Sequence, residues 1–589
     1  MCGIAGYVGG KNAPVVLFNM LKSLEYRGYD SAGIAYVSEG KIHVPKDKGK
    51  VDDVRAKLKP ETLKSHIGVG HTRWATHGVP SQLNAHPHAD CTGDFVVAHN
   101  GIIENHAELK QELSERGHTF RSETDTEVIA HLMEEYYDGD LLAAFKTMLG
   151  RLKGSFAITV LSTSDTDAIL VARNESPLLI GLGRGENYVA SDAPAFISET
   201  KEALILEDLE YGIVKKDSVE LFSLKTGEKV TKTPHRITWS VKEAEKGGYH
   251  HFMLKEIYEE PQAAANAIRD LEKIRRIAAR ISKCRFVYFV GCGTAYHAGL
   301  YGKYLCERMG LHADAVIGSE FRYSTVESIN EECAVVAISQ SGETADTLAA
   351  VKEAGKRGAY TAAFVNVVGS SITRACEDSA LIHAGPEIAV ASTKAYIGQL
   401  VCVAALAFEV GHATMKLDRG RYQALIGELK GVGGEISQAL SQDHVRALAE
   451  REANTRSFFY LGRRENYPTA LEGALKLKEI SYVHAEGYAA GELKHGPLAL
   501  MNEEVVVIVV TASDELKHKV ESNVSEVKAR GARVYQVGPS GDIRVPKVDP
   551  LLAPIVNIVP LHLFAYYISV LKGLDPDKPR NLAKSVTVE

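Results

Sequence analysis

The residue with the clearest chemical potential lies at the start of the chain, where Cys2 directly follows the initiator Met1. Removal of Met1 would leave Cys2 with a free α-amine beside its thiol. An α-amine titrates near pH ~8, so it can serve as the general base for a neighbouring nucleophile. An isolated Met-Cys start usually has no such meaning, because few thiols ionise unaided. The hypothesis of an N-terminal nucleophile therefore depends on partners elsewhere in the chain.

Polar clusters in the first third of the chain offer such partners. Asn100 and Gly101 follow an expected strand and could give an amide and a backbone N–H to an oxyanion, although Asn-Gly is also a common hairpin turn. Arg73 offers a planar fork for a carboxylate. Asp125 offers an anion for an ammonium, although a helix N-cap is also expected there. A carboxylate, an ammonium and an amide carbonyl held near a thiol would suit glutamine.

Five motifs, in this order, resemble the glutaminase domain of class II glutamine amidotransferases. They are Met-Cys-Gly-Ile at residue 1, Leu-Glu-Tyr-Arg-Gly-Tyr-Asp-Ser-Ala-Gly at 24, His-Thr-Arg-Trp-Ala-Thr-His-Gly at 71, His-Asn-Gly at 99 and Ser-Glu-Thr-Asp-Thr-Glu at 122. The resemblance implies that Cys2 attacks the glutamine amide, giving a thioester and ammonia, with Asn100 and Gly101 as oxyanion donors. The glutamine ligands that it implies are Arg73, Trp74 (on a loop that closes over the site), Thr76, His77 and Asp125.

The second half of the chain carries a different set of polar residues. Residues 339–344 (Ser-Gln-Ser-Gly-Glu-Thr) follow an expected strand and could wrap a phosphate with backbone N–H groups at a helix N-terminus. Capping of that helix by Ser341 is the alternative. Glu472, Lys476 and Glu479 fall on one face of an expected helix, where surface ion pairing is the usual explanation.

The elements that must position these residues differ between the two halves. The first third is expected to form a layered α+β domain. Strands are expected at residues 3–8, 33–37, 67–70, 95–99, 156–161, 168–172 and 188–191, and helices at 14–24, 107–116 and 126–137.

The second half contains an internal repeat. Residues 286–291 match 457–462, and residues 357–359 match 530–532, at a nearly constant offset. Each copy alternates short apolar strands with helical stretches, which indicates two parallel α/β sheets that bind ligands at the carboxyl ends of their strands. Only the first copy has the glycine of the 339–344 loop, so the phosphate is assigned to it. The loop after its first strand lacks the final glycine of a dinucleotide fingerprint, and NAD is not expected.

These segments also resemble a family. They are Ser-Gln-Ser-Gly-Glu-Thr at 339, Val-Ala-Ser-Thr-Lys at 390, the Glu/Lys helix, the glycine-bounded His495 loop and the tail Asn-Leu-Ala-Lys-Ser-Val-Thr-Val-Glu at 581. They resemble paired sugar-isomerase (SIS) domains. Joined to the glutaminase domain, they resemble the isomerizing glutamine–fructose-6-phosphate aminotransferases nearly from end to end. The one visible departure is Ala295, where serine is expected and where a phosphate or hydroxyl contact could be lost.

The resemblance implies conversion of D-fructose 6-phosphate and L-glutamine to D-glucosamine 6-phosphate and L-glutamate, the first step of hexosamine and UDP-N-acetylglucosamine synthesis. In it, ammonia is channelled to a Schiff base that Lys584 forms with the sugar. His495 helps to open the sugar ring, and Glu479, assisted by Lys476, moves the proton of the isomerisation. The tail with Lys584 is expected to act as a lid over the sugar. The sugar-phosphate ligands implied are Thr294, Ser339, Gln340, Ser341, Thr344, Val390 and Ser392.

The expected fold is therefore a multidomain α/β and α+β protein. An N-terminal-nucleophile (Ntn) glutaminase domain with αββα layers spans residues 2–221, and a linker with a docking helix spans 222–276. Two doubly wound parallel-sheet SIS domains span 277–417 and 448–579, and a catalytic tail spans 580–589. A homodimer through the SIS domains is expected.

Composition narrows the class further. A formal net charge of −7 argues against a general nucleic-acid binder. The eight cysteines show no metal-like spacing, and His86 and His88 are poorly spaced for one site, so no metal is expected and a reducing cytoplasm fits best. Electrons only shift within the sugar, so no cofactor is expected. The apolar stretch 551–571 is expected to be a strand, a turn and a buried helix, and no membrane span is expected.

Two alternatives remain at this stage. The first is another class II glutamine amidotransferase, for instance one with a phosphoribosyl diphosphate acceptor, which the repeat and the Lys584 tail disfavour. The second is a sugar-phosphate-binding regulator with idle catalytic groups. Its sign would be the loss of Cys2, Glu479 or Lys584, and all three are present.

Overall fold

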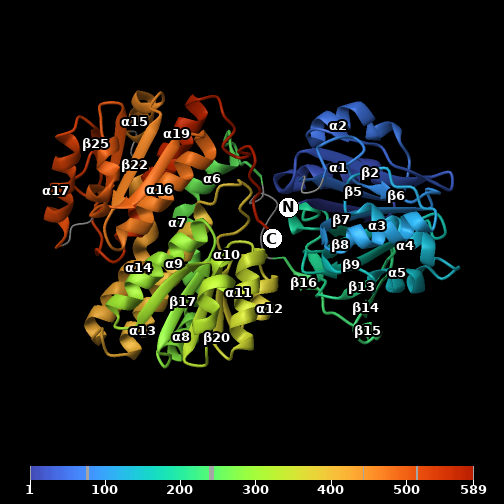
Figure 1. Ribbon diagram of the computed structural model, residues 1–589, viewed down its shortest axis with the longest axis horizontal. Coiled ribbons are helices and arrows are strands. Elements are labelled where there is room, and N and C mark those ends of the chain that lie inside the picture. The colour runs from blue at the N-terminus through green and yellow to red at the C-terminus, as the bar shows by residue number, and fades with distance from the viewer. Residues whose placement is uncertain (1, 75–77, 238–244, 442–443, 512–514, 588–589) are drawn as a thin grey trace. The chain divides into compact units, whose positions relative to one another are not determined.

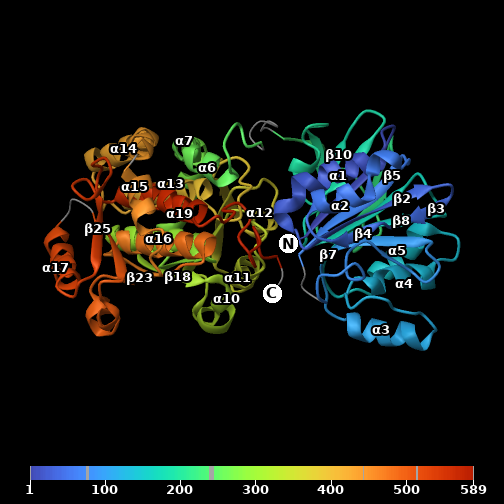
Figure 2. The ribbon, with the colours of Figure 1, turned by 90° about the horizontal axis from the view of Figure 1, so that it is seen from above.

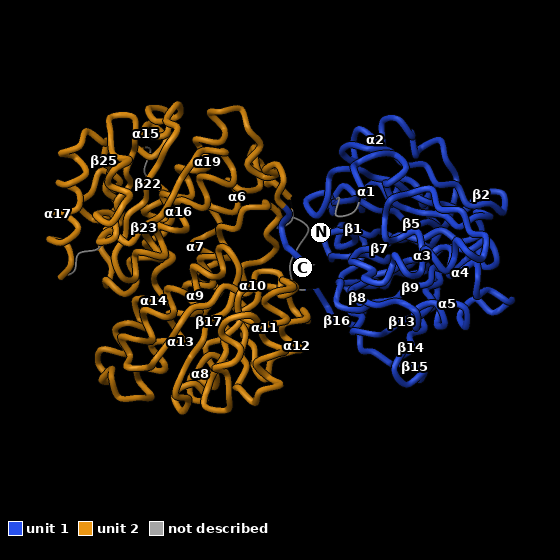
Figure 3. Tube along the Cα trace, in the orientation of Figure 1, with its two compact units in different colours: residues 1–244, 583–589 blue, residues 245–582 orange. Residues whose placement is uncertain are grey.

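The chain folds into two compact units (Figures 1 and 3). The computed structural model describes residues 2–74, 78–237, 245–441, 444–511 and 515–587. The first unit comprises residues 1–244 together with 583–589, and the second comprises residues 245–582. The last residues of the chain thus belong to the unit that begins it.

The first unit is built on two antiparallel sheets. One has the strand order β16-β12-β10-β11-β1-β5-β2-β3, with β4 paired to β2, and the other has the order β15-β14-β13-β9-β8-β7-β6. The strands of the first sheet are β1 (Gly3–Val8), β2 (Ser31–Ser38), β3 (Lys41–His43), β4 (Lys46–Lys48), β5 (Ile67–Arg73), β10 (Leu179–Leu182), β11 (Asn187–Ala190), β12 (Glu202–Ile205) and β16 (His235–Arg236). Those of the second are β6 (His88–Ala89), β7 (Phe95–Ile103), β8 (Gly154–Ser162), β9 (Ile169–Asn174), β13 (Glu210–Val214), β14 (Val219–Ser223) and β15 (Lys229–Val230).

Alternating side chains on these strands produce the αββα layering expected from the sequence. On β1, Ala5 and Tyr7 pack toward helices, whereas Ile4 and Val8 pack in a core that also holds residues of the second sheet. The first sheet is covered by α1 (Ala13–Leu24) and α2 (Val51–Leu58). The second is covered by α3 (His106–Glu115), α4 (Glu127–Tyr136) and α5 (Leu141–Leu149) (Figure 2).

The second unit contains two parallel sheets with the same topology, which confirms the internal repeat. Their orders are β18-β17-β19-β20-β21 and β23-β22-β24-β25-β26. The first consists of β17 (Phe286–Gly291), β18 (His312–Ile317), β19 (Cys333–Ser339), β20 (Tyr360–Val365) and β21 (Asp378–Leu381). The second consists of β22 (Ser457–Gly462), β23 (His484–Ala489), β24 (Val505–Val510), β25 (Arg533–Gly538) and β26 (Ile543–Arg544).

Helices surround both sheets (Figure 1), and most of them share one continuous core, whereas α11 and α12 pack in separate cores on the first sheet and α17 packs in one on the second. They are α6 (Phe252–Tyr258), α7 (Glu260–Ala267), α8 (Leu271–Ile281), α9 (Thr294–Arg308), α10 (Gly318–Glu320), α11 (Ala345–Lys356), α12 (Ser371–Ala375), α13 (Lys394–Ala413), α14 (Arg419–Leu440), α15 (His444–Glu452), α16 (Asn466–Ser481), α17 (Lys517–Lys528), α18 (Ala553–Asn557) and α19 (Val559–Leu571). The helices α9 and α16 begin just after β17 and β22, and they pack against each other.

Two helical segments are long and apolar enough to cross a membrane, α13 and the α18–α19 segment. Of the most apolar window in each, 94% and 83% lies buried within the fold, so both serve as core helices. The strand expected at the start of 551–571 is wrong. Pro554 and Pro560 stand in the first turns of α18 and α19, where the missing N–H costs no helical hydrogen bond.

Candidate functional site

Cys2 lies at the entrance to β1, the strand between β11 and β5 in the first unit. Its Sγ accepts the backbone N–H of Trp74 at 3.2 Å, and the thiol faces the Trp74 carbonyl oxygen at 3.4 Å. Trp74 directly follows β5, so two neighbouring strands of one sheet place the thiol. Burial raises the pKa of the Cys2 thiol above its ordinary value, and the thiol therefore needs a base to become a nucleophile at neutral pH.

Asn100 lies beside Cys2 and is held from two sides. Its Nδ2 donates to the Cys2 carbonyl oxygen at 3.0 Å and to Ser191 Oγ at 2.8 Å, and its Oδ1 lies 3.0 Å from Nε2 of His71. That ring nitrogen also faces the carbonyl of His99 at 3.0 Å, so it must be the donor. These contacts fix the direction of the Asn100 amide at the nucleophile.

The hairpin-turn alternative for Asn100 and Gly101 is wrong, because both residues lie within β7. They pair with Ala157 and Phe156 of β8. Gly101 has φ +120°, and a Cβ there would lie 2.0 Å from the Ser155 carbonyl oxygen. Only glycine fits this position.

Two buried arginines flank the nucleophile. Arg73, expected from the sequence, donates from Nη2 to the Gly78 carbonyl oxygen at 3.2 Å. Arg27 was missed, although it lies in the motif at 24–33. Its Nε donates to the Cys2 carbonyl oxygen at 3.2 Å, and its Nη1 pairs with Asp192 at 3.1 Å. The feature of the sequence that could have pointed to Arg27 is Gly28, the residue after it. A Cβ on Gly28 would lie 2.7 Å from the Arg73 backbone, so this segment packs directly against Arg73.

These groups line a pocket within the first unit. Asp125 lies in its wall and accepts the Ile103 N–H at 2.8 Å; the α4 N-cap is Thr126, so the N-cap alternative for Asp125 is wrong. Ser176 Oγ is buried there without a hydrogen-bond partner among the described residues. The lining residues are Cys2, Arg27, Arg73, Trp74, His86, His99, Asn100, Gly101, Thr124, Asp125, Thr126, Ser176, Pro177, Ala583, Ser585, Val586 and Thr587. Thr76 and His77 lie outside the described residues.

The C-terminal tail contributes to this pocket, which the sequence did not indicate. Ala583, Ser585, Val586 and Thr587 line it, and the half-buried Lys584 lies among them. The tail had been assigned only a role over the sugar. Its place beside Cys2 follows from tertiary folding, because the short sequence 581–589, which mixes polar with apolar residues, does not specify which surface it covers.

In the second unit, a buried group of charges joins the two sheets at α9 and α16. Lys476 lies 3.3 Å from Glu472 and also pairs with Glu479. Thr294 Oγ1 donates to Glu472 at 3.0 Å and accepts from Lys476 Nζ at 3.1 Å. His297 Nδ1 lies 2.6 Å from the second Glu472 oxygen. The surface-pair alternative is therefore wrong for Glu472 and Lys476, whose side chains are 0% and 1% exposed.

The charges in this group stabilise one another. Burial raises the pKa of Glu472, but Lys476 and His297 outweigh it and lower the pKa to about 2. Burial likewise lowers the pKa of Lys476, but Glu472 and Glu479 raise it above its ordinary value. Glu472 and His297 were not among the expected site residues. Two features of the sequence could have pointed to them. Glu472 lies one helical turn before Lys476, and His297 lies at the end of the first turn of α9.

The loop 339–344 joins β19 to α11 at the carboxyl edge of the first parallel sheet. Ser339 Oγ accepts the Gly342 N–H at 3.0 Å and lies 3.0 Å from Thr344 Oγ1. Gly342 has φ +65°, and a Cβ there would meet Ser370 Oγ at 2.0 Å. The α11 N-cap is Thr344, and Ser341 Oγ instead accepts the Glu343 N–H at 3.1 Å, so the alternative that Ser341 caps the helix is wrong. Gln340 accepts at its carbonyl oxygen from the Asn366 N–H.

The remaining expected residues lie on three other segments. The Val390 N–H donates to the Asp577 carbonyl oxygen at 3.1 Å, and Ser392 Oγ is buried without a hydrogen-bond partner among the described residues. His495 ends the 3₁₀ turn Glu492–His495 and is exposed. Ala295 packs in the apolar core of the unit.

Comparisons with known proteins agree with this division. A glutamine amidotransferase domain model matches residues 71–198, and a SIS domain model matches residues 280–408 and 453–538. The glutamine–fructose-6-phosphate aminotransferases (isomerizing) of Pyrococcus horikoshii and Thermococcus kodakarensis are 50% and 49% identical over 602 residues, with 100% of each chain covered. The solved C-terminal domain of glucosamine-fructose-6-phosphate aminotransferase from Francisella tularensis matches with a TM-score of 0.54 and 36% identity, covering 57% of this chain and 100% of that one.

Proposed function

The chain belongs to the family of isomerizing glutamine–fructose-6-phosphate aminotransferases, and we propose that it performs the reaction for which the family is named. It converts D-fructose 6-phosphate and L-glutamine to D-glucosamine 6-phosphate and L-glutamate, the entry to hexosamine and UDP-N-acetylglucosamine synthesis. One observation supports this proposal most strongly. The same chain holds the Cys2 thiol site on one fold and the buried Glu472–Lys476 site on another, and its relatives match it over its full length.

In the first unit the proposed reaction is glutamine hydrolysis at Cys2. After removal of Met1, the α-amine takes the thiol proton and the sulfur attacks the glutamine amide carbon. Asn100 and the Gly101 N–H stabilise the oxyanion, and ammonia leaves a thioester that water hydrolyses to glutamate. The α-carboxylate of glutamine is assigned to Arg73 with Thr76 and His77, its ammonium to Asp125, and Trp74 closes the site. The distances of Asn100 and Trp74 to Cys2 support these roles.

In the second unit the phosphate of the sugar is assigned to Ser339, Gln340, Ser341 and Thr344, with Thr294, Val390 and Ser392 nearby. Support comes from Gly342, whose positive φ presents the loop backbone at a helix N-terminus. The unpartnered Ser392 hydroxyl is a further free hydrogen-bonding group in this unit.

The proposed chemistry at the sugar uses two lysines and two acid–base groups. His495 assists ring opening, and Lys584 forms a Schiff base with the C2 carbonyl, from which ammonia then displaces it. Glu479 takes a proton from C1 and one is returned to C2, so that the double bond moves from C2 to C1. Lys476 assists as a cation next to Glu479. Electrons move only within the sugar, so the proposal requires no redox cofactor.

We propose the domain boundaries, the oligomeric state and the cellular location from the same family membership. We assign residues 2–221 to glutaminase, 222–276 to a linker with a docking helix, 277–417 and 448–579 to the SIS domains and 580–589 to the catalytic tail. A homodimer through the SIS domains, a cytoplasmic location and the absence of nucleic-acid and membrane partners are part of the proposal. Free cysteines at positions 2, 91, 284, 292, 306, 333, 376 and 402 are compatible with a reducing compartment.

A two-donor assay of the full-length protein tests the proposal. Wild-type protein should form glucosamine 6-phosphate from fructose 6-phosphate with glutamine and not without a nitrogen donor. Cys2→Ala should lose the glutamine-dependent reaction and retain one supported by added ammonia, whereas Cys284→Ser, in the second unit, should behave as wild type. Product from a phosphoribosyl acceptor, or no product with either donor, would contradict the assignment in favour of another amidotransferase or a regulator.

A further inference from the structure

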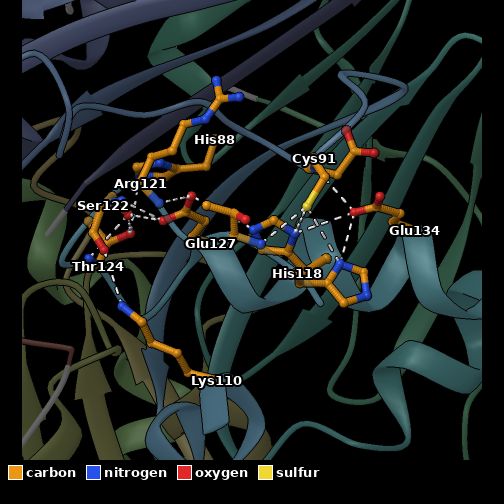
Figure 4. Close-up of polar contacts among 12 residues, drawn as sticks. His88, Cys91, Lys110, His118, Arg121, Ser122, Thr124, Glu127 and Glu134 are labelled. Carbon is orange, nitrogen blue, oxygen red and sulfur yellow. Dashed lines mark hydrogen bonds and ion pairs between the residues drawn. The ribbon is translucent and has the colours of Figure 1, made fainter. Parts of the chain in front are cut away.

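Outside both proposed active sites, four polar side chains converge on one side of the first unit (Figure 4). Cys91 lies in the loop between β6 and β7, His118 follows α3, and His131 and Glu134 lie one turn apart on α4. One ligand-capable atom from each residue lies within 4.8 Å of the corresponding atoms of the other three. None of these residues takes part in the proposed chemistry.

Four separations within this cluster lie near the edge lengths of a tetrahedral metal site. Cys91 Sγ lies 3.7 Å from His118 Nδ1 and 3.5 Å from His131 Nδ1. Glu134 Oε2 lies 3.0 Å and 3.4 Å from the same two nitrogens. Zinc bonds of about 2.3 Å to sulfur and about 2.0–2.1 Å to nitrogen or oxygen, at tetrahedral angles, require ligand separations of roughly 3.3–3.6 Å.

A second, independent feature points in the same direction. His118 presents its remaining ring nitrogen to a carboxylate, with Nε2 3.1 Å from Glu135, whereas His131 Nε2 lies 3.8 Å from Glu127 and is buried without a hydrogen-bond partner among the described residues. Histidines that bind metals characteristically donate the other N–H to a carboxylate, which fixes the tautomer and the ring orientation. Here both rings are oriented with Nδ1 toward the shared centre.

Hydrogen bonding alone explains this arrangement poorly. A neutral His118 ring that donates from Nε2 to Glu135 has no proton left for Nδ1, yet its Nδ1 lies 3.0 Å from Glu134 Oε2. The side chains of His118 and His131 are only 8% and 1% exposed, so both rings lie inside the cluster. A cation at the centre satisfies all of these groups with neutral rings.

We propose that Cys91, His118, His131 and Glu134 bind a zinc ion. A thiolate and two imidazoles favour zinc over calcium or magnesium, which prefer oxygen ligands. Because the protein supplies all four ligands, the site is of the closed, structural kind and leaves no position for substrate. The sequence did not indicate it, because only His131 and Glu134 are close in the chain, and the expectation of no metal rested on spacing alone.

The consequence of this site concerns the glutamine pocket. The ion joins the β6–β7 loop, the end of α3 and α4, and the segment between His118 and His131 contains Thr124 and Asp125 of the pocket wall. Glu127, which faces His131, also accepts the backbone N–H groups of residues 121 and 122 at 2.8 and 2.7 Å. Zinc would thus hold in place the segment that carries Asp125.

Metal analysis of the full-length protein tests the proposal. Protein produced with supplemented zinc and then dialysed should carry about one zinc ion per chain. Cys91→Ser and His118→Ala should lose it, whereas Cys284→Ser, a half-buried cysteine of the second unit, should keep it. Zinc retained by Cys91→Ser, zinc lost only by Cys2→Ala, or no zinc in the wild type would each overturn the proposal.

Cobalt substitution and an outer-carboxylate variant separate ligation from a folding defect. Cobalt added to the chelator-treated wild type should give the thiolate charge-transfer band and intense visible bands of tetrahedral Co²⁺, and Cys91→Ser should lack the charge-transfer band. Glu135→Gln, which spares all four ligands, should weaken zinc binding by about 10–100-fold. The exposed Glu115→Gln on α3 is its matched control. Equal affinities of these two variants, or an octahedral cobalt spectrum, would contradict the site.

Discussion

At the residue scale, each proposed active site depends on a buried ionisable group whose neighbours decide its state. The Cys2 thiol is held by the Trp74 N–H, but burial raises its pKa, so a base must assist it. Glu472 shows the opposite balance. It is 0% exposed and yet stays ionised, because Lys476 and His297 hold its pKa at about 2. A thiol that needs a base and a carboxylate that cannot hold a proton have different functional meanings: the first is the proposed nucleophile, and the second holds Lys476 in place.

The low pKa of Glu472 predicts acid sensitivity of the second unit. A pKa lowered from 4.5 to about 2 stabilises the fold above pH 4.5, and this stabilisation, roughly 3 kcal/mol, is lost as the pH falls toward 2. Thermal unfolding followed from pH 6 to ~pH 2 should show a steeper fall for the wild type than for Glu472→Gln. The exposed Glu521→Gln on α17 should follow the wild type. Parallel curves for wild type and Glu472→Gln would contradict the shift.

At the element scale, regular strands and helices were predictable and their ends were not. The strand at 3–8 and the helix at 14–24 are confirmed, because alternating and helical apolar periods dominate there. The strand expected to stop at 99 continues to Ile103, since Gly101 tolerates a positive φ within β7. The contacts of Asn100 with Cys2, and the meeting of Cys91 with His118, join residues far apart in sequence. No local pattern encodes them.

The loop between β19 and α11 gives a prediction at this scale. Gly342→Ala places a methyl group 2.0 Å from Ser370 Oγ at a positive φ, which should distort the proposed phosphate loop. We expect the KM for fructose 6-phosphate to rise at least about tenfold, which corresponds to about 1.4 kcal/mol, with ammonia as donor. Gly355→Ala, near the end of the helix α11 and with open space around it, is the matched control. An unchanged KM in Gly342→Ala would remove the loop from the site.

At the scale of the whole molecule, the two units carry separable half-reactions. The topology of each was predictable, because five glutaminase motifs and one internal repeat extend over long stretches of sequence. The position of the C-terminal tail in the fold was not predictable. Ala583, Ser585, Val586 and Thr587 belong to the first unit and line the Cys2 pocket, although the proposed task of Lys584 is at the sugar. Under the proposed roles, a tail that borders the Cys2 pocket and carries Lys584 would link the two half-reactions.

Substitution of Lys584 should separate the two half-reactions. Lys584→Ala should abolish glucosamine 6-phosphate synthesis with either glutamine or ammonia, because no Schiff base can form, and should leave part of the glutaminase activity. Lys572→Ala, an exposed lysine after α19, is the control and should leave both activities intact. Glutamate release and amino sugar formation are measured on the same samples. Normal synthesis by Lys584→Ala would exclude the proposed role.

The central claim is that nitrogen from glutamine hydrolysed at Cys2 becomes the amino group of the sugar. The most direct measurement supplies amide-¹⁵N glutamine and fructose 6-phosphate in the presence of excess unlabelled ammonium, and determines the mass of the product. The account predicts glucosamine 6-phosphate that carries mostly ¹⁵N in the wild type, and only unlabelled product in Cys2→Ala. Labelled ammonia released to solution without labelled amino sugar would contradict it.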